Sequence, residues 1–133
     1  MNQSFGLLKP DCLERGIQED IFKMIRSFDL KIIKMKKVQL NEKNVDAIWS
    51  SCRNEYFYKD MVRFLTSGKC IVFLVEGEDA INRLNVLVGH YDPLKAGKGT
   101  IRGPFGCSAM ENVIHSSLNE EAFQREANLF FSL

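Results

Sequence analysis

The segment CIVFLV, Cys70 to Val75, is the feature that most constrains how this chain can fold. Six consecutive apolar residues leave neither face of an extended segment for water, so the run predicts a central strand of a sheet covered on both faces. The run is far too short to span a bilayer. The first residues, MNQSFGLLKPD, also lack the basic start and long apolar stretch of a signal peptide. We therefore expect a cytoplasmic protein with no membrane partner.

Other segments alternate between strand-like and helix-like patterns. Three further strands are predicted at SFGLL (4–8), KIIKMKKVQL (31–40) and MENVIHSS (110–117). Helices are predicted over 12–29, from Asn41 to Trp49, over 57–65, over 78–88 and after Asn119. The order β-α-β-α-α-β-α-β-α in 133 residues predicts one domain, 1–133, of the α/β or α+β class.

Two local features remain between these elements. Asp11, after Pro10, is expected to cap an early turn. The stretch from Gly89 to Gly106 is rich in glycine and contains two prolines, so no regular element is expected there. Loops of that length inside a compact domain are usually functional or disordered.

Charge and cysteine content exclude several classes of function. The net charge is +1, which gives no general attraction to nucleic acid or to a membrane surface. The basic strand from Lys31 to Lys37 leaves an RNA-binding hypothesis open, but a solvated face of lysines explains it better. Four cysteines without any C-x-x-C pair predict free thiols rather than disulfides or a zinc site, with Cys70 in the core: Cys12, Cys52, Cys70 and Cys107.

One of the two histidines, His115, follows an apolar stretch and precedes two serines in NVIHSS. The glycine-rich loop before it carries Lys95, Lys98 and Arg102, and such loops can turn backbone amides and a guanidinium toward phosphate oxygens. Its GKGT segment lacks the spacing and context of a Walker P-loop. From the residues alone, a catalytic histidine and a structural one remain equally good explanations.

Four segments decide between these explanations: LLKPDCLERG, NEYFYKDMVRFLTSGKC, GHYDPLKAGKGTIRG and NVIHSS. In their order and near-identical spacing they resemble the nucleoside diphosphate kinase family from about Ser4 to Phe131. The resemblance implies an α+β sandwich with a ferredoxin-like βαββαβ core, in which a four-stranded antiparallel sheet carries added helices. It also implies nucleoside triphosphates and diphosphates as substrates, Mg²⁺ bound with the nucleotide rather than by protein ligands, and a homo-oligomer, either hexamer or tetramer.

The resemblance also implies roles for individual residues. His115 matches the family histidine that takes the γ-phosphate and passes it to a second nucleotide in a ping-pong reaction. Glu126 matches the glutamate that holds this histidine, and Ser117 a serine that approaches the same carboxylate. Lys9 and Arg102 match the family cations that bind the phosphates, and Asn112 matches the asparagine that contacts the sugar. Tyr56 matches the aromatic residue on which the base stacks, and Trp49 matches a residue near the active-site lysine.

The sequence departs from the family pattern at three places. Asn85 replaces a phosphate-binding arginine, Tyr91 replaces a threonine that contacts the same phosphate, and Ser116 and Leu118 replace glycine and aspartate after the histidine. Losing one charged phosphate contact costs about 1.5–3 kcal/mol, or roughly ten- to a hundredfold in rate. Two hypotheses follow: a working, slower or more specialised kinase, and a nucleotide-binding or protein-interaction domain with impaired catalysis.

Overall fold

The computed structural model describes residues 2–132. These residues contain a four-stranded antiparallel sheet. Its strands are β1 (Asn2–Leu8), β2 (Lys31–Gln39), β3 (Lys69–Gly77) and β4 (Ile114–Ser116). They lie in the order β2-β3-β1-β4. The central place predicted for the apolar strand at Cys70–Val75 is confirmed, because β3 pairs with β1 on one side and β2 on the other.

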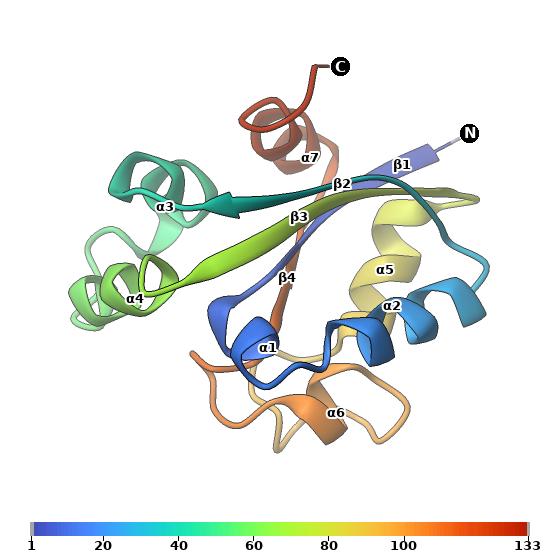
Figure 1. Ribbon diagram of the computed structural model, residues 1–133, viewed down its shortest axis with the longest axis horizontal. Coiled ribbons are helices and arrows are strands. Elements are labelled where there is room, and N and C mark those ends of the chain that lie inside the picture. Colours follow the sequence, from blue (N-terminus) through green and yellow to red (C-terminus); the bar gives the residue numbers. More distant parts are fainter. Residues whose placement is uncertain (1, 133) are drawn as a thin grey trace.

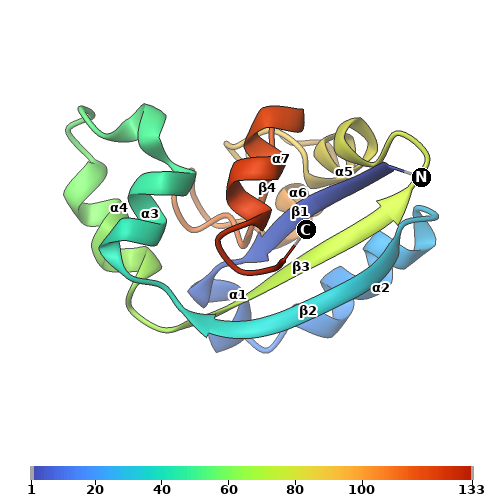
Figure 2. The same cartoon turned by 90° about the horizontal axis from the view of Figure 1, so that it is seen from above.

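Two helices cover one face of this sheet (Figures 1 and 2). They are α2 (Gln18–Ser27) and α5 (Ala80–Val88), which pack Ile21, Phe22 and Leu84 against the alternate residues of β3. Phe22 meets Phe73 edge to face, with ring centroids 5.4 Å apart. Since α2 joins β1 to β2 and α5 joins β3 to β4, the core is βαββαβ, as the resemblance predicted.

The opposite face is covered by the added helices. These are α3 (Glu42–Ile48), α4 (Tyr58–Leu65) and α7 (Glu120–Ala127), with the short 3₁₀ helix η1 (Ser50–Cys52) between α3 and α4. The caps predicted from the sequence are present. Asn41 forms a capping box with Asn44, and Asn119 accepts from the backbone N–H of Ala122. The first turn of α7 thereby fixes the face on which Glu126 lies.

The helix predicted over residues 12–29 is broken at Gly16, whose φ is +68°. The chain forms α1 (Pro10–Glu14) and then α2, because a glycine accepts a positive φ without steric cost. The expectation that Asp11 caps this turn is wrong. Lys9 occupies the cap position without a side-chain bond, and the Asp11 carboxylate instead accepts from the distant backbone N–H of Val113.

The expectation that residues 89–106 contain no regular element is also wrong. A short helix, α6 (Arg102–Phe105), begins where the hydroxyl of Thr100 accepts from the backbone N–H of Gly103. Gly103 suits this position because a Cβ there would come within 2.2 Å of the Gly97 carbonyl oxygen. The arginine of this helix is bonded to two distant segments, so tertiary contacts override the local signals for a loop.

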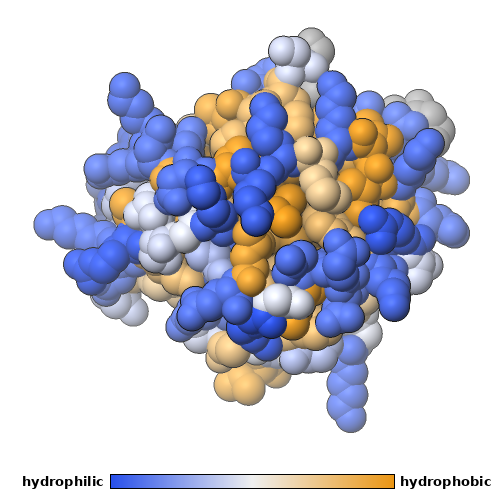
Figure 3. Space-filling model, viewed as in Figure 1, coloured by the Kyte–Doolittle hydropathy of each residue, from blue (hydrophilic) through white to orange (hydrophobic). Residues whose placement is uncertain are grey.

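The surface carries a mixture of hydrophilic and hydrophobic side chains (Figure 3). On the face shown in Figure 3, hydrophilic side chains surround a central hydrophobic area, a mixture that is ordinary for globular proteins. All four cysteines are free thiols, and Cys70 is buried in the core as predicted. Among residues 2–132, no helix has the length and apolar character needed to cross a membrane.

Candidate active site

His115 lies on β4 opposite Leu7 of β1, and a carboxylate from α7 holds its ring. The Nε2 atom is 2.7 Å from Oε1 of Glu126, and the hydroxyl of Ser117 donates to the same oxygen at 2.8 Å. Glu126 is only 2 % exposed, so these bonds are sheltered from water. Because an ionised carboxylate only accepts hydrogen bonds, Nε2 carries the ring proton.

The second nitrogen of His115, Nδ1, therefore has its lone pair available. No hydrogen bond to Nδ1 is found within residues 2–132, and the side chain is 14 % exposed rather than enclosed. Burial, opposed by Glu126 and reinforced by the charges of Lys9 and Arg102, lowers the pKa of His115 below its usual 6.5. The imidazole is consequently neutral at pH 7 and able to act as a nucleophile.

Lys9 stands at the end of β1, next to the histidine strand. Its Nζ donates to Oδ1 of Asn112 at 2.7 Å and lies 5.8 Å from the centroid of the Trp49 ring. Trp49 in turn packs on His115, with ring centroids 4.9 Å apart. Burial, and then the charge of Arg102, lower the pKa of Lys9 to about 7.

Arg102 supplies a second cation from α6. Its Nη1 donates to the carbonyl of Gly89 at 3.0 Å and its Nη2 to that of Ile114 at 2.7 Å, while its buried Nε has no partner in the described chain. Burial lowers the pKa of Arg102 to about 10, so it remains charged at neutral pH. Neither Lys9 nor Arg102 forms a salt bridge within residues 2–132. The charge of Asp11 opposes the lowering of the Lys9 pKa but does not reverse it, so an anion would relieve the remaining positive field.

Lys9, Arg102 and Asn112 line a pocket of ≈ 540 Å³, together with aromatic and apolar side chains of α4 and its neighbouring turns. Tyr56, predicted to stack under the base, lines this pocket and is 96 % exposed, so its ring face is open to a planar ligand. Tyr91 lines the pocket from the opposite loop, and its backbone carbonyl accepts from Nδ2 of Asn112 at 2.8 Å. The pocket thus joins a cationic end to an aromatic end, the shape expected for a nucleotide.

Two of the three departures from the family pattern, Asn85 and the Ser116–Leu118 segment, lie together in the structure, whereas Tyr91 lines the pocket beside Lys9. Ser116 donates to Oδ1 of Asn85 at 2.5 Å, and Nδ2 of Asn85 donates to the carbonyls of Ser117 and Leu118 at 3.0 and 3.3 Å. Asn85 therefore ties α5 to the chain that follows His115. Both ends of its amide already have partners, so a nucleotide contact by Asn85 stays a prediction without structural support. The side chain of Leu118 is 76 % exposed.

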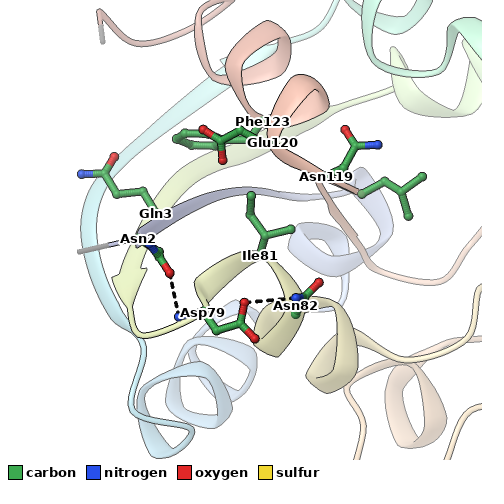
Figure 4. Close-up of a pocket in the computed structure, with 9 residues that line it drawn as sticks. Asn2, Gln3, Asp79, Ile81, Asn82, Asn119, Glu120 and Phe123 are labelled. Atoms are coloured by element: carbon green, nitrogen blue, oxygen red, sulfur yellow. Dashed lines mark hydrogen bonds between the residues drawn. The ribbon is translucent and has the colours of Figure 1, made fainter.

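A second hollow, of ≈ 520 Å³, opens between the starts of β1, α5 and α7 (Figure 4). Asn2 accepts from the backbone of Asp79, and the carboxylate of Asp79 accepts from Asn82. The hollow is lined by Asp79 and Glu120 and by none of the cations of the first pocket. Its charge is unsuited to a phosphate, in contrast to that of the pocket beside Lys9.

The structure also shows contacts that the sequence did not predict. Arg125 donates through Nε to the carbonyl of Ala47 at 3.0 Å, and its Nη2 lies 3.5 Å from Oε2 of Glu126. It thus joins the Glu126 carboxylate to the end of α3 beside Trp49. The bond from Val113 to Asp11 was also missed. In sequence, Asp11 shows only as an acidic residue in a first turn, and nothing local indicates its distant partner.

Comparison with known proteins identifies relatives of the whole chain. The family model described as "Nucleoside diphosphate kinase" matches residues 2–133. A nucleoside diphosphate kinase of Thermosipho africanus is 34% identical over 132 residues, which are 99% of this chain and 90% of the relative. One from Saccharolobus islandicus is 34% identical over 131 residues, 98% of this chain and 95% of the relative.

Solved structures agree with these sequence matches. A nucleoside diphosphate kinase from Encephalitozoon cuniculi superposes with a TM-score of 0.94 at 28% identity, covering 98% of this chain and 88% of that one. A halophilic nucleoside diphosphate kinase from Halobacterium salinarum, solved in complex with CDP, superposes with a TM-score of 0.93 at 32% identity. The match covers 98% of this chain and 87% of that one.

Proposed function

This chain belongs to the nucleoside diphosphate kinase family and is a nucleotide phosphotransferase, and we propose that it transfers the γ-phosphate through a phosphohistidine on His115. One observation carries the proposal. A neutral histidine, with Nε2 held by Glu126 and Nδ1 without a partner in the described chain, stands beside two desolvated cations. In the first half-reaction Nδ1 attacks the γ-phosphorus of a triphosphate, and the diphosphate departs with the bridging oxygen. A second diphosphate then takes the phosphoryl group from Nδ1.

Each neighbouring residue has a part in this scheme. Lys9 and Arg102 neutralise the charge that gathers on the phosphate oxygens, which is the main contribution an enzyme makes to phosphoryl transfer. Glu126 stabilises the positive charge on the ring as the N–P bond forms, and Ser117 orients that carboxylate. Asn112 is proposed to contact the sugar by exchanging one of the bonds that its amide makes to Lys9, Tyr91 and Ala109.

The base is proposed to stack on Tyr56 at the aromatic end of the pocket. Stacking on an exposed ring tolerates any base, because every base has a π-face. Tyr91, on the facing loop, is proposed as a second nucleotide contact.

Mg²⁺ is proposed to enter with the nucleotide. The side chains nearest the cationic end are amides, aromatics and cations, so phosphate oxygens are the hard ligands that such an ion prefers. The ion would neutralise part of the phosphate charge.

The assembly and domain assignments remain proposals that follow the family resemblance. We propose that residues 1–133 act as one domain and that copies associate as a hexamer or a tetramer. Sedimentation equilibrium measures the assembly directly. The cytoplasmic location and the absence of a nucleic acid partner stay predictions.

Labelling experiments test the proposed reaction. The protein is incubated with γ-labelled ATP and Mg²⁺, and the expected result is acid-labile label that leaves when GDP is added. His115→Asn should bind nucleotide without taking label. Absence of label on the unaltered protein, with nucleotide binding intact, would instead support the nucleotide-binding domain without turnover. Label that leaves for only one diphosphate would indicate a specialised kinase.

A further inference from the structure

Val113, two residues before the histidine, has an unusual backbone conformation. Its φ is +67°, a region that β-branched residues rarely enter. The backbone N–H of Ile114 donates to the carbonyl of Asn112 at 2.9 Å, which closes a γ-turn around Val113. Turns of this kind with positive φ are rare and strained. Strain of this kind persists only where the surrounding structure holds it in place.

Two bonds from the start of the chain hold this turn. The backbone N–H of Val113 donates to Oδ2 of Asp11 at 3.2 Å, and the carbonyl of Val113 accepts from the backbone N–H of Lys9 at 2.8 Å. Val113 is fully buried and Asp11 is 5 % exposed, so water does not compete for either hydrogen bond. Burial raises the pKa of the Asp11 carboxyl, which means that the fold keeps this group buried at a cost in free energy.

The turn lies between Asn112 and His115, two residues of the candidate site. Asn112, directly before it, holds the ammonium group of Lys9, and His115 follows two residues after it. If Val113 relaxed to an extended conformation, the chain before it, which carries Asn112, would change direction relative to β4, which carries His115. Asn112, which lines the pocket, would then shift relative to His115, whose ring packs on the pocket residue Trp49.

We propose that Asp11 is a positioning residue for phosphoryl transfer: its carboxylate fixes the γ-turn at Val113 and thereby the relative placement of Asn112 and His115. The inference rests on the proposed function but concerns a different set of bonds. Without an acceptor at position 11, the N–H of Val113 would be buried and unpaired, a costly state that favours relaxation of the turn. The predicted effect is therefore on the chemical step more than on nucleotide affinity.

The test uses two readouts on the full chain: hydrogen exchange of the Val113 amide, and the single-turnover rate of label transfer from saturating γ-labelled ATP. Labelling of the unaltered protein tests the proposed function first, independently of Asp11. Asp11→Ala is then expected to speed exchange at Val113 and to slow labelling roughly 10- to 100-fold, as small displacements of reacting groups do. Asp11→Asn keeps an oxygen acceptor and should retain both the protection and more of the rate.

Ile25→Ala is the matched control, because Ile25 is fully buried in α2 and is not among the residues that line the pocket. It should lower the melting temperature while leaving the labelling rate of the folded protein unchanged. The proposal is overturned if Asp11→Ala leaves the Val113 amide protected, or if its labelling rate falls no more than that of Ile25→Ala.

Discussion

At the scale of single residues, the charge of Lys9 sets the pH response of the site. Its pKa of about 7 in the free protein results mainly from burial, so a bound phosphate should raise this pKa again. Below pH 7 the lysine is already protonated, and above pH 7 binding must take up a proton. His115, with its lowered pKa, stays neutral in this range, and Arg102, with a pKa of about 10, stays charged. We therefore expect nucleotide affinity to fall as pH rises above 7.

Calorimetry in buffers of different ionisation enthalpy measures this proton uptake at pH 8. The apparent binding enthalpy should depend on the buffer in the unaltered protein and lose that dependence in Lys9→Met. A binding enthalpy that is the same in every buffer would show that Lys9 does not change protonation on binding.

Glu126 supports His115 through charge as well as position. Glu126→Gln keeps the size of the side chain but removes the negative charge that stabilises the ring as it becomes phosphorylated. Losing the carboxylate partner of a metal-bound histidine typically costs roughly 10- to 100-fold, and we expect a loss of similar size in the single-turnover rate of His115 labelling. Ser117→Ala, which removes only one donor to the same oxygen, should cost less. Equal labelling rates for Glu126→Gln and the unaltered protein would show that the charge of Glu126 does not contribute to the reaction.

At the scale of elements, Asn85 joins α5 to β4 through the hydroxyl of Ser116 and two carbonyls. Replacing either side chain by alanine should destabilise the fold by about 1 kcal/mol. The double substitution should cost less than the sum of the two, with a coupling of about 0.5–1 kcal/mol, because both remove one shared bond. Denaturant unfolding of the four proteins measures the coupling, and strict additivity would contradict the pairing.

Gly6 allows β1 to lie close beside Phe73 of β3. A Cβ at this position would meet the Phe73 ring at 2.3 Å, so Gly6→Ala should destabilise the sheet by about 1–3 kcal/mol through overpacking. Gly99→Ala is the control, since nothing lies within 4 Å of where the new Cβ would stand. Its free energy of unfolding should change by no more than about 0.5 kcal/mol. Thermal unfolding compares the two, and similar losses would argue against the steric explanation.

The elements that the sequence predicted best are those with strong local signals. The apolar run of β3 and the caps at Asn41 and Asn119 specify their elements through nearby residues alone. The strand predicted over 110–117 is shortened to Ile114–Ser116 because the turn at Val113 depends on Asp11, about a hundred positions away. The helix α6 likewise forms where Arg102 bonds to two distant carbonyls, a cause that no local pattern carries.

At the scale of the whole molecule, the site exists only because the fold brings the end of β1, the loop before β4, β4 itself and α7 together. Local patterns left His115 undecided between structural and catalytic roles, and the resemblance to the family supplied the site residues. Physical reasoning from the sequence could not supply the lowered pKa of Lys9 or the proton position on His115. Both depend on burial and on partners that the assembled fold provides.

Nδ1 of His115 is the atom proposed to receive the phosphoryl group, and the roles proposed for its neighbours all depend on that. Correlated ¹H–³¹P NMR on the protein treated with ATP and Mg²⁺ locates that group on the ring. We predict one phosphoryl group, on Nδ1 of His115, because Glu126 holds Nε2. A phosphoryl group on Nε2, or on His90 instead, would contradict the account.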